Sequence, residues 1–271
     1  MNFADKATLV RFTENKNGNT TPMSNALFNH RSIRKFKDTP VPELVLNRIL
    51  EAAVRGSNTG NLQFYSIIVT TNISLKEKLW AYHFKQDMVK QAPVILTFCA
   101  DINRFNRYCE QREATPVYDN FLWFVNGVID AVIAAQNASL EAENNGLGIC
   151  YLGTTTYMAQ PISELLQLPK GVAPVTSVVV GYPDENPGLT ERLPLEAVVH
   201  YQQYKQFSES DIQAIYSEFE NLEKIKNLII ENNVENMAQI ITQKRYNGKD
   251  NKLFSQKYLE FITNQGFMNN D

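Results

Sequence analysis

The sequence NHRSIRKF occupies residues 29–36 and sets the expectations for the rest of the chain. It holds one histidine, two arginines, one lysine and one serine, spaced so that several side chains can converge on one anion. An arginine guanidinium binds phosphate through two parallel hydrogen bonds, and a neighbouring serine adds a neutral donor. A solvated basic turn has the same composition. The stretch therefore predicts either an anion site at the edge of an ordered element or an exposed positive turn.

Three later segments carry further motifs, namely SNTGNLQ at 57–63, NNGLGICYLG at 144–153, and VGYP to RLP at 180–194. With residues 29–36 they resemble the ordered motifs of the nitroreductase superfamily, which read HRSIRKF, PSSGNLQ, GLG…YIG and GYP…RLP. The four matches occur in the family order and span residues 29–204, about two thirds of the chain. The long C-terminus is similar to that of the NADPH-oxidising, oxygen-insensitive nitroreductases and flavin reductases.

The resemblance implies an α+β protein of nitroreductase-like fold, with a mixed, mainly antiparallel sheet flanked by helices and a C-terminal helical excursion. We expect an N-terminal extension at 1–28, an FMN-binding core at 29–207 and a helical C-terminal arm at 208–271.

Hydrophobic periodicity gives an independent reading of the elements. A helix should begin at Pro42, because proline and the following acid suit a first turn. Further helices are predicted at 75–91, 118–145, 161–168, 211–227 and 252–263, and strands at 66–71, 93–100, 150–152 and 175–180. Helices alternating with four or five strands indicate an α+β sheet.

The segment 118–145 is the longest expected helix and has little polar face. A helix that is apolar most of the way round must be buried, either in the core or against a partner chain. The resemblance implies that part of this helix packs against a partner chain, because the family is homodimeric with its flavin site at the subunit interface.

Composition excludes several classes of protein. A net charge of −3 argues against nucleic acid or an anionic membrane as the main partner. We expect no membrane span, because no run approaches the roughly 18 apolar residues required, and residues 1–23 lack a secretory apolar stretch. Cys99, Cys109 and Cys150 cannot all pair and lack metal-ligand spacing, so a reducing cytoplasm and no metal site are expected.

The resemblance assigns the FMN phosphate to Arg31, Ser32 and Arg192, which come from widely separated segments. Arg34 is similar to the family arginine at the pyrimidine edge, where a fixed cation stabilises the reduced flavin. His30 is assigned to the ribityl–phosphate side, and a hydrogen bond to backbone is the alternative reading.

Asn58 and Asn61 resemble the asparagines of a loop that contacts the ring or ribityl chain, in this family generally from the second subunit. An ordinary Asn/Gly turn is the alternative. Gln86 aligns with a glutamine that contacts the flavin, expected from the same subunit as that loop; on residues alone it is a surface amide.

The residues Tyr151, Leu152, Gly153 and Thr154 resemble the segment that runs along the flavin ring near N5. Glycine suits that place, because backbone approaches a ring closely only where no side chain intervenes. For the preceding Cys150, core packing and proximity to the cofactor are both open.

The sequence departs from the family pattern at two places. Thr190-Glu191 precedes Arg192 where the subgroup has Lys-Pro, so a phosphate ligand is lost and an acid gained. Phe64-Tyr65 replaces Pro-Trp, which should alter packing more than chemistry. For the 2′-phosphate of NADPH, Lys244 and Arg245 offer a basic cluster, and a solvated turn is the alternative.

No general acid–base pair, activated nucleophile or Rossmann phosphate loop is evident, which fits chemistry carried by a cofactor. The resemblance implies an FMN-dependent NAD(P)H oxidoreductase with a ping-pong mechanism, using NADPH or NADH as donor and a nitroaromatic, quinone or flavin as small aromatic acceptor. The alternatives are a flavin reductase that releases reduced FMN and a flavin-binding protein without turnover.

Overall fold

The computed structural model describes residues 22–269. The chain divides into two compact units, one joining Thr21–Gly188 to the segment from Leu253 onward and one containing Leu189–Lys252. The expected arm ran from residue 208 to residue 271, whereas the smaller unit begins at Leu189. It ends at Lys252, because the second half of the last helix packs into the core of the larger unit. Of the expected N-terminal extension, residues 1–21 lie outside the described part, and helix α1 (Pro22–Phe28) follows.

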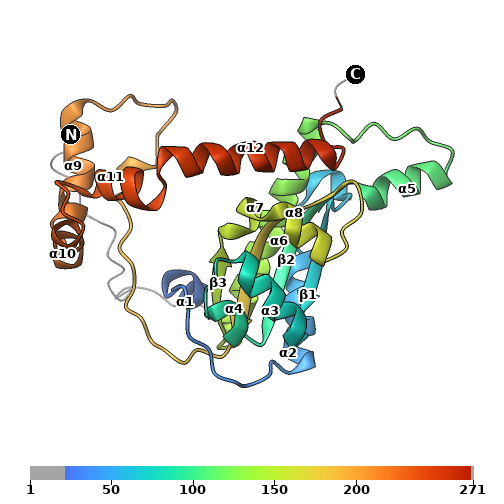
Figure 1. The fold of residues 1–271 in the computed structure, drawn as a ribbon, viewed down its shortest axis with the longest axis horizontal. Helices are drawn as coiled ribbons and strands as arrows, with labels where there is room; N and C mark the ends of the chain where they lie inside the picture. Colours follow the sequence, from blue (N-terminus) through green and yellow to red (C-terminus); the bar gives the residue numbers. More distant parts are fainter. Residues whose placement is uncertain (1–21, 270–271) are drawn as a thin grey trace. The chain divides into compact units, whose positions relative to one another are not determined.

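The larger unit is built on a four-stranded sheet of order β1-β2-β4-β3, in which every neighbouring pair is antiparallel (Figure 1). Its strands are β1 (Tyr65–Thr70), β2 (Val94–Asp101), β3 (Gly148–Leu152) and β4 (Val172–Gly181). A parallel bridge between Ser32 and Ile149 adds the basic motif to the β3 edge. The predicted α+β fold with a mixed, mainly antiparallel sheet is therefore confirmed.

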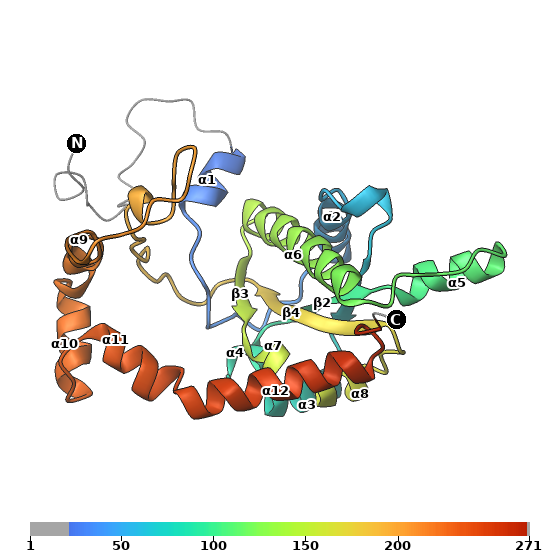
Figure 2. The same cartoon turned by 90° about the horizontal axis from the view of Figure 1, so that it is seen from above.

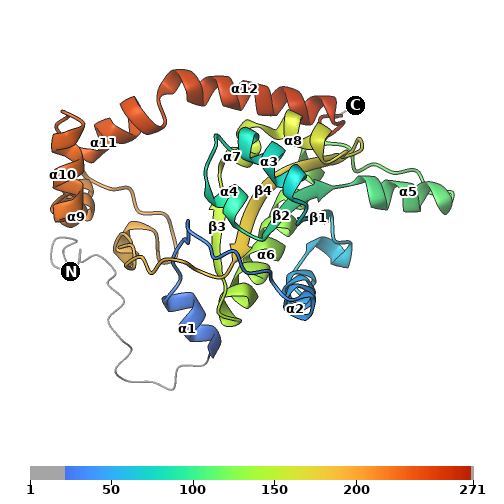
Figure 3. The ribbon, with the colours of Figure 1, turned by 60° about the horizontal axis from the view of Figure 1, so that its bottom comes forward.

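Helices cover both faces of this sheet (Figure 2). The first face carries α6 (Phe121–Asn144) and α2 (Glu43–Val54), which pack on Leu96, Phe98 and Val178. The second face carries four helices, α3 (Ile73–Tyr82), α4 (Met88–Gln91), α7 (Thr154–Tyr157) and α8 (Ala159–Leu165) (Figure 3). Every residue of β2 is buried, which explains its continuous apolar sequence.

Helix α6 confirms the predicted long helix. The Asn120 side chain accepts a hydrogen bond from the Trp123 backbone at its start, and Gly146 adopts φ +75° just beyond its end. Its small residues face the sheet, and a Cβ added to Gly127 would lie 2.9 Å from a backbone oxygen.

The opposite side of α6 exposes large apolar side chains, namely Phe121, Leu122, Ile129 and Val132. By length and composition α6 also passes a test for a membrane span, contrary to the expectation from the sequence that no run would do so. In the structure it is the core helix of the larger unit.

The predicted single helix at 75–91 is wrong, because α3 ends at Tyr82 and α4 begins only at Met88. Phe84 and Lys85 adopt φ of +54° and +57°, a left-handed conformation that interrupts a right-handed helix. The remaining elements of this unit are the 3₁₀ turn η2 (Thr59–Asn61) and helix α5 (Asn103–Gln111).

The smaller unit is helical. Its elements are the 3₁₀ turn η3 (Leu195–Ala197), α9 (Glu209–Glu220), α10 (Glu223–Glu231), α11 (Met237–Ile240) and the π-helical turn η4 (Ile241–Arg245). A capping box of Ser208 and Asp211 begins α9. The chain breaks near Asn221, so the predicted helix at 211–227 is two helices. Helix α12 (Gly248–Asn264) crosses the boundary between the units.

Candidate functional site

The basic motif runs alongside strand β3. The Ile33 backbone N–H donates to the Ile149 carbonyl at 2.9 Å, and Phe36 forms an antiparallel bridge with Pro183. Close packing fixes this path, since a Cβ added to Gly148 would lie 2.5 Å from the Ile33 side chain. The motif is therefore an ordered extension of the sheet edge and not a solvated turn.

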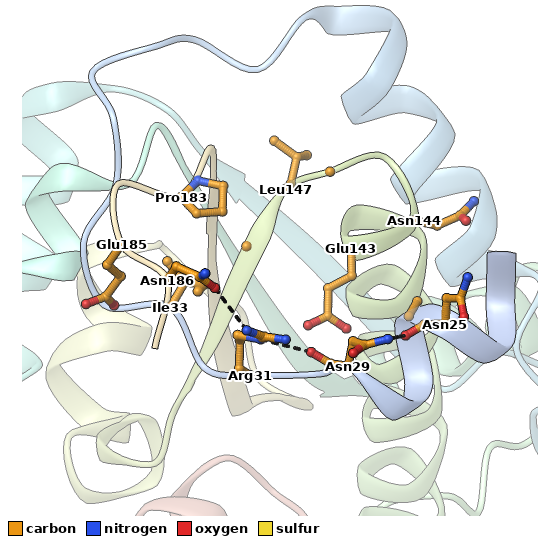
Figure 4. Close-up of a pocket in the computed structure, with 13 residues that line it drawn as sticks. Asn25, Asn29, Arg31, Ile33, Glu143, Asn144, Leu147, Pro183, Glu185 and Asn186 are labelled. Carbon is orange, nitrogen blue, oxygen red and sulfur yellow. Dashed lines mark hydrogen bonds between the residues drawn. The ribbon is translucent and has the colours of Figure 1, made fainter. Parts of the chain in front are cut away.

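Arg31 lines a cavity of about 560 Å³ together with Glu143 of α6 (Figure 4). His30 Nδ1 lies 2.6 Å from Glu143 Oε1, so its partner is a carboxylate and not backbone. Arg31 Nη1 donates to Asn186 Oδ1 at 2.9 Å and to the Pro187 carbonyl at 3.1 Å. Two carboxylates, one of them Glu143, also line this cavity, so its charge is mixed and Arg31 is its cationic side chain.

The second carboxylate of that cavity, Glu185, binds the turn of the basic motif. Its Oε1 accepts from the backbone N–H of Arg34 at 2.5 Å and of Lys35 at 3.1 Å. The Arg34 side chain is exposed to solvent.

Ser32 and Arg34 both influence the Cys150 thiol on β3. Burial raises the pKa of the Cys150 thiol, whereas the Arg34 charge and a hydrogen bond with Ser32 lower it and the Glu185 charge raises it. All three of the chain's cysteines are free and buried. Core packing and proximity to the cofactor were both open for Cys150. The two are compatible, because this buried residue lies beside the predicted cofactor ligands.

A second group lies just beyond the end of β3, where the turn between α3 and α4 meets α7. His83 Nδ1 lies 2.7 Å from Thr154 Oγ1, and Gln86 Nε2 lies 3.5 Å from the same oxygen. His83 is fully buried, and burial lowers its pKa to about 4. Gln86 therefore lies beside Thr154 of its own chain. The expectation that it contacts the flavin from the same subunit as the Asn58 loop stays a prediction.

The predicted segment 151–154 divides between core and surface. Tyr151 turns toward α6, where its hydroxyl oxygen accepts from Ser139 Oγ at 3.2 Å, and burial raises its pKa. Leu152 is buried in the core of the other face. Gly153 is exposed, and a Cβ added there would meet no atom within 4 Å. The backbone at Gly153 is therefore open to a flat ligand.

The loop with Asn58 and Asn61 precedes β1 and lies at the opposite edge of the sheet. Asn58 Oδ1 accepts from the Gln63 backbone at 3.1 Å, so this side chain shapes its own turn. Asn61 is exposed, with φ +58°. With strands about 4.8 Å apart, three steps across the sheet separate this loop from β3 by about 14 Å. One chain therefore does not bring these asparagines to Ser32 and Thr154.

Sequence reasoning missed the residue that holds this loop, which is Asp130 of α6. It is 1% exposed, and it accepts hydrogen bonds from the Thr59 backbone, the Thr59 hydroxyl and the Phe64 backbone at 2.9, 3.1 and 3.1 Å. An acid in the middle of the apolar part of this helix, far from Glu141 and Glu143 at its end, is a signal that was available. His83 was also missed, although it is one of only three histidines.

The remaining predicted residues belong to the smaller unit. Arg192 is exposed, and its Nη1 donates to the Thr190 carbonyl at 3.0 Å. The neighbouring Glu191 forms an ion pair with Lys224 of α10, which offsets the acid gained at this position. Lys244 and Arg245 are exposed at the end of the π-helical turn η4.

Within residues 22–269, no group of three or more His, Cys, Asp or Glu residues has a metal-binding arrangement. The β3 edge instead collects a guanidinium, hydroxyls, an amide and an open stretch of backbone. Such a set can hold an anionic, planar ligand by charge, hydrogen bonds and close approach.

Known proteins share the sequence pattern and the fold of this chain. A sequence model of the Nitroreductase family matches residues 27–86 and 81–182. An oxygen-insensitive NADPH nitroreductase of Salmonella typhimurium is 38% identical over 70% of this chain and 77% of its own length. An FMN reductase [NAD(P)H] of Bacillus subtilis is 33% identical over 87% and 89%.

Solved structures extend the likeness to nearly the whole chain. The NADPH:FMN oxidoreductase of Vibrio harveyi in complex with NAD⁺ superimposes with a TM-score of 0.77 at 28% identity, covering 91% of this chain and 99% of that one. A candidate oxidoreductase from Bacteroides fragilis reaches a TM-score of 0.89 at 44% identity, covering 90% and 100%.

Proposed function

The chain belongs to the nitroreductase family of NAD(P)H-dependent flavin and nitro oxidoreductases, and we propose that it uses bound FMN to reduce a small aromatic acceptor. The observation that carries this proposal is the grouping of Ser32, Arg34, Gly153 and Thr154 at one edge of the sheet. When bound, FMN supplies the chemistry, taking a hydride from the nicotinamide and delivering two electrons to the acceptor.

The residues at the β3 edge fit such a cofactor. Gly153 leaves backbone uncovered, which allows a flat ring to approach closely. Arg34 provides a cation close enough to act on Cys150, as Ser32 does, and a cation suits an edge that gains negative charge on reduction. Arg31 sits in the same ordered motif, and Arg192 is the exposed guanidinium of the matching RLP segment in the smaller unit. We propose that Arg31, Arg192 and Ser32 hold the phosphate, with His30 nearby on the ribityl side.

We further propose that the working unit is a homodimer. Helix α6 leaves an apolar stripe uncovered in one chain, with Leu122 at 63% and Ile129 at 49% exposure. The Asn58–Asn61 loop lies at the sheet edge remote from Ser32, so its asparagines reach a flavin only in a second subunit's site. An interface over α6 would bury the stripe and bring the loop to that site.

The proposal assigns this chain to the cytoplasm, since three buried, unpaired cysteines suit a reducing compartment. The proposed electron donor is NADPH or NADH. The relatives named above include both a nitroreductase and an FMN reductase, so a flavin reductase that releases reduced FMN is the second candidate.

The test is a visible spectrum of the purified protein followed by steady-state kinetics. We expect flavin absorption at one FMN per chain, and NADPH oxidation that a quinone or nitroaromatic accelerates. Free FMN serving as a better acceptor than either, with loss of bound flavin during turnover, would favour the flavin reductase. A flavin that stays oxidised in excess NADPH and NADH would contradict both.

A further inference from the structure

His83 is a buried imidazole with only one of its two nitrogens satisfied. Its side chain is fully buried, and Nδ1 lies 2.7 Å from Thr154 Oγ1. Nε2 is buried and has no hydrogen-bond partner in the described part of the chain. A buried polar atom without a partner calls for an explanation, because such atoms are rare in native proteins.

The protonation state of the His83 ring follows from the fact that Nδ1 has a hydrogen-bond partner and Nε2 has none among the described residues. A charged imidazole would bury a cation with a second N–H unpaired, so the ring is neutral. Its one hydrogen lies either on Nε2, leaving a buried donor unpaired, or on Nδ1, leaving only an acceptor lone pair unpaired. Buried unpaired donors are the rarer of the two in native structures. His83 is therefore assigned the Nδ1–H tautomer, which donates to Thr154 Oγ1.

Gln86 completes the environment of that oxygen. Its Nε2 donates to the His83 carbonyl at 3.0 Å, which fixes the orientation of the amide, and it approaches Thr154 Oγ1 at 3.5 Å. A hydroxyl has two acceptor lone pairs and one hydrogen. With donors from His83 and Gln86 on the oxygen, the Thr154 hydrogen is left to donate to another group.

The turn that carries His83 is tightly constrained. Phe84 and Lys85 hold left-handed φ angles, which cost free energy for residues other than glycine. The Phe84 ring stacks near Tyr157 at the far end of α7, with centroids 6.4 Å apart. The turn therefore contacts both ends of the short helix α7, which begins at Thr154 immediately after the open backbone of Gly153.

We propose that His83 is a positioning residue that holds the Thr154 hydroxyl as a hydrogen-bond donor directed at an acceptor atom of the bound flavin ring. The inference rests on the proposed function, because it needs a flavin beside Gly153. Two parts of it can be tested separately, namely the tautomer of His83 in the protein without cofactor and the effect of Thr154 on bound FMN.

The first test is ¹⁵N-histidine NMR of the cofactor-free protein. With three histidines in the chain, the His83 resonances are assigned by their absence in His83→Asn. We expect a protonated Nδ1 and an unprotonated Nε2, unchanged between pH 6 and pH 9. A protonated Nε2 would overturn the proposal, whether or not the protein binds FMN.

The second test compares FMN dissociation constants and flavin midpoint potentials in a double-mutant cycle. Thr154→Val removes the hydroxyl at constant shape, and His83→Phe removes the group that orients it. We expect each to weaken FMN binding about fivefold, as one neutral hydrogen bond implies, and to shift the potential in the same direction. The double variant should do no more than Thr154→Val alone.

Conservative and matched controls separate positioning from a general effect on folding. His83→Asn keeps a donor at the place of Nδ1, and Thr154→Ser keeps the hydroxyl, so both should retain the wild-type potential. His200→Phe, in the smaller unit, should leave binding and potential unchanged. Additive shifts in the cycle, or a wild-type potential in Thr154→Val with FMN bound, would overturn the proposal. Failure of the wild type to bind FMN would instead refute the proposed function.

Discussion

Asp130 accepts two hydrogen bonds from Thr59, one from the backbone N–H at 2.9 Å and one from the hydroxyl at 3.1 Å. The other carboxylate oxygen accepts from the Phe64 backbone N–H at 3.1 Å. This buried acid therefore satisfies both ends of the loop that enters strand β1. An acid in an apolar helix is costly unless such partners are present, so the loop explains its place in α6.

Replacing Asp130 should loosen the loop and destabilise the larger unit. Asp130→Ala leaves the buried backbone N–H of Phe64 and the part-buried one of Thr59 without this acceptor, and we expect a loss of about 3 kcal/mol in the free energy of unfolding. The matched control is Thr59→Val, which removes only the hydroxyl bond and should cost about 1 kcal/mol. Urea unfolding of the three proteins gives the comparison. Equal costs for the two variants would mean that Asp130 does not organise the loop.

The sequence predicted those elements whose pattern depends on burial alone. Strand β2 is apolar throughout because both of its faces are covered, and α6 was evident from its length and from the glycine that follows it. The break between α3 and α4 was not predictable. Its left-handed positions are held by Phe84 and Lys85, and neither residue type signals a turn as glycine does.

The site was predictable only in part for a similar reason. The family resemblance pointed to residues 29–34, which the structure shows as a continuous segment beside β3. The grouping of His83 and Gln86 with Thr154 depends on a tertiary contact over about 70 positions, for which no local pattern exists. Likewise, the ion pair of Glu191 with Lys224 joins residues from separate segments of the chain, and no sequence pattern indicates such a pairing.

Stability should fall in mild acid because of His83. Its pKa is lowered from 6.5 to about 4 in the folded state, so the unfolded chain binds the proton more readily. This contribution is present above pH 6.5 and is lost as the pH falls toward 4, by about 2 kcal/mol between pH 7.5 and pH 5. Carboxylates titrate in the same range, so the difference between wild type and His83→Asn is the quantity to measure. Parallel pH profiles for the two proteins would contradict the assignment.

The three arginines should separate into two roles. We expect Arg31→Ala and Arg192→Ala each to weaken FMN retention by about 1.5–3 kcal/mol, as loss of a charged hydrogen bond implies. Arg34→Ala should lower the flavin reduction potential with a smaller effect on retention, since a cation at the ring edge favours the reduced form. Equilibrium dialysis and potentiometry on all three variants test this division. Equal effects on both quantities would show that the roles are misassigned.

Disrupting the exposed stripe of α6 should produce monomers. Ile129→Lys places a charge in the proposed interface, and we expect a concentration-dependent loss of the dimer together with loss of FMN. Ile230 on α10 is 75% exposed and lies outside the stripe, so Ile230→Lys is the matched control. Analytical ultracentrifugation with detection of flavin absorbance measures both properties. A dimeric, yellow Ile129→Lys protein would place the interface elsewhere.

The preference for the nicotinamide is expected to be modest. The 2′-phosphate of NADPH carries about −1.5 to −2 charges and requires a cationic contact. Lys244 and Arg245 end the π-helical turn η4 with exposed side chains, so they are free of the core and accessible to a ligand. Exposed cations in water contribute little individually. We therefore expect NADPH to be favoured over NADH by about tenfold, or about 1.4 kcal/mol.

The decisive comparison is kcat/KM for the two donors in the wild type and in a Lys244→Ala/Arg245→Ala double variant. If these residues bind the phosphate, the double variant should lose the preference by a rise in KM for NADPH, while kcat and the values for NADH stay unchanged. Raising the ionic strength should reduce the wild-type preference in the same way, because exposed charges are screened. Lys226→Ala on α10 removes one exposed cation from the same unit and serves as the control. An unchanged ratio in the double variant would exclude this cluster as the phosphate contact.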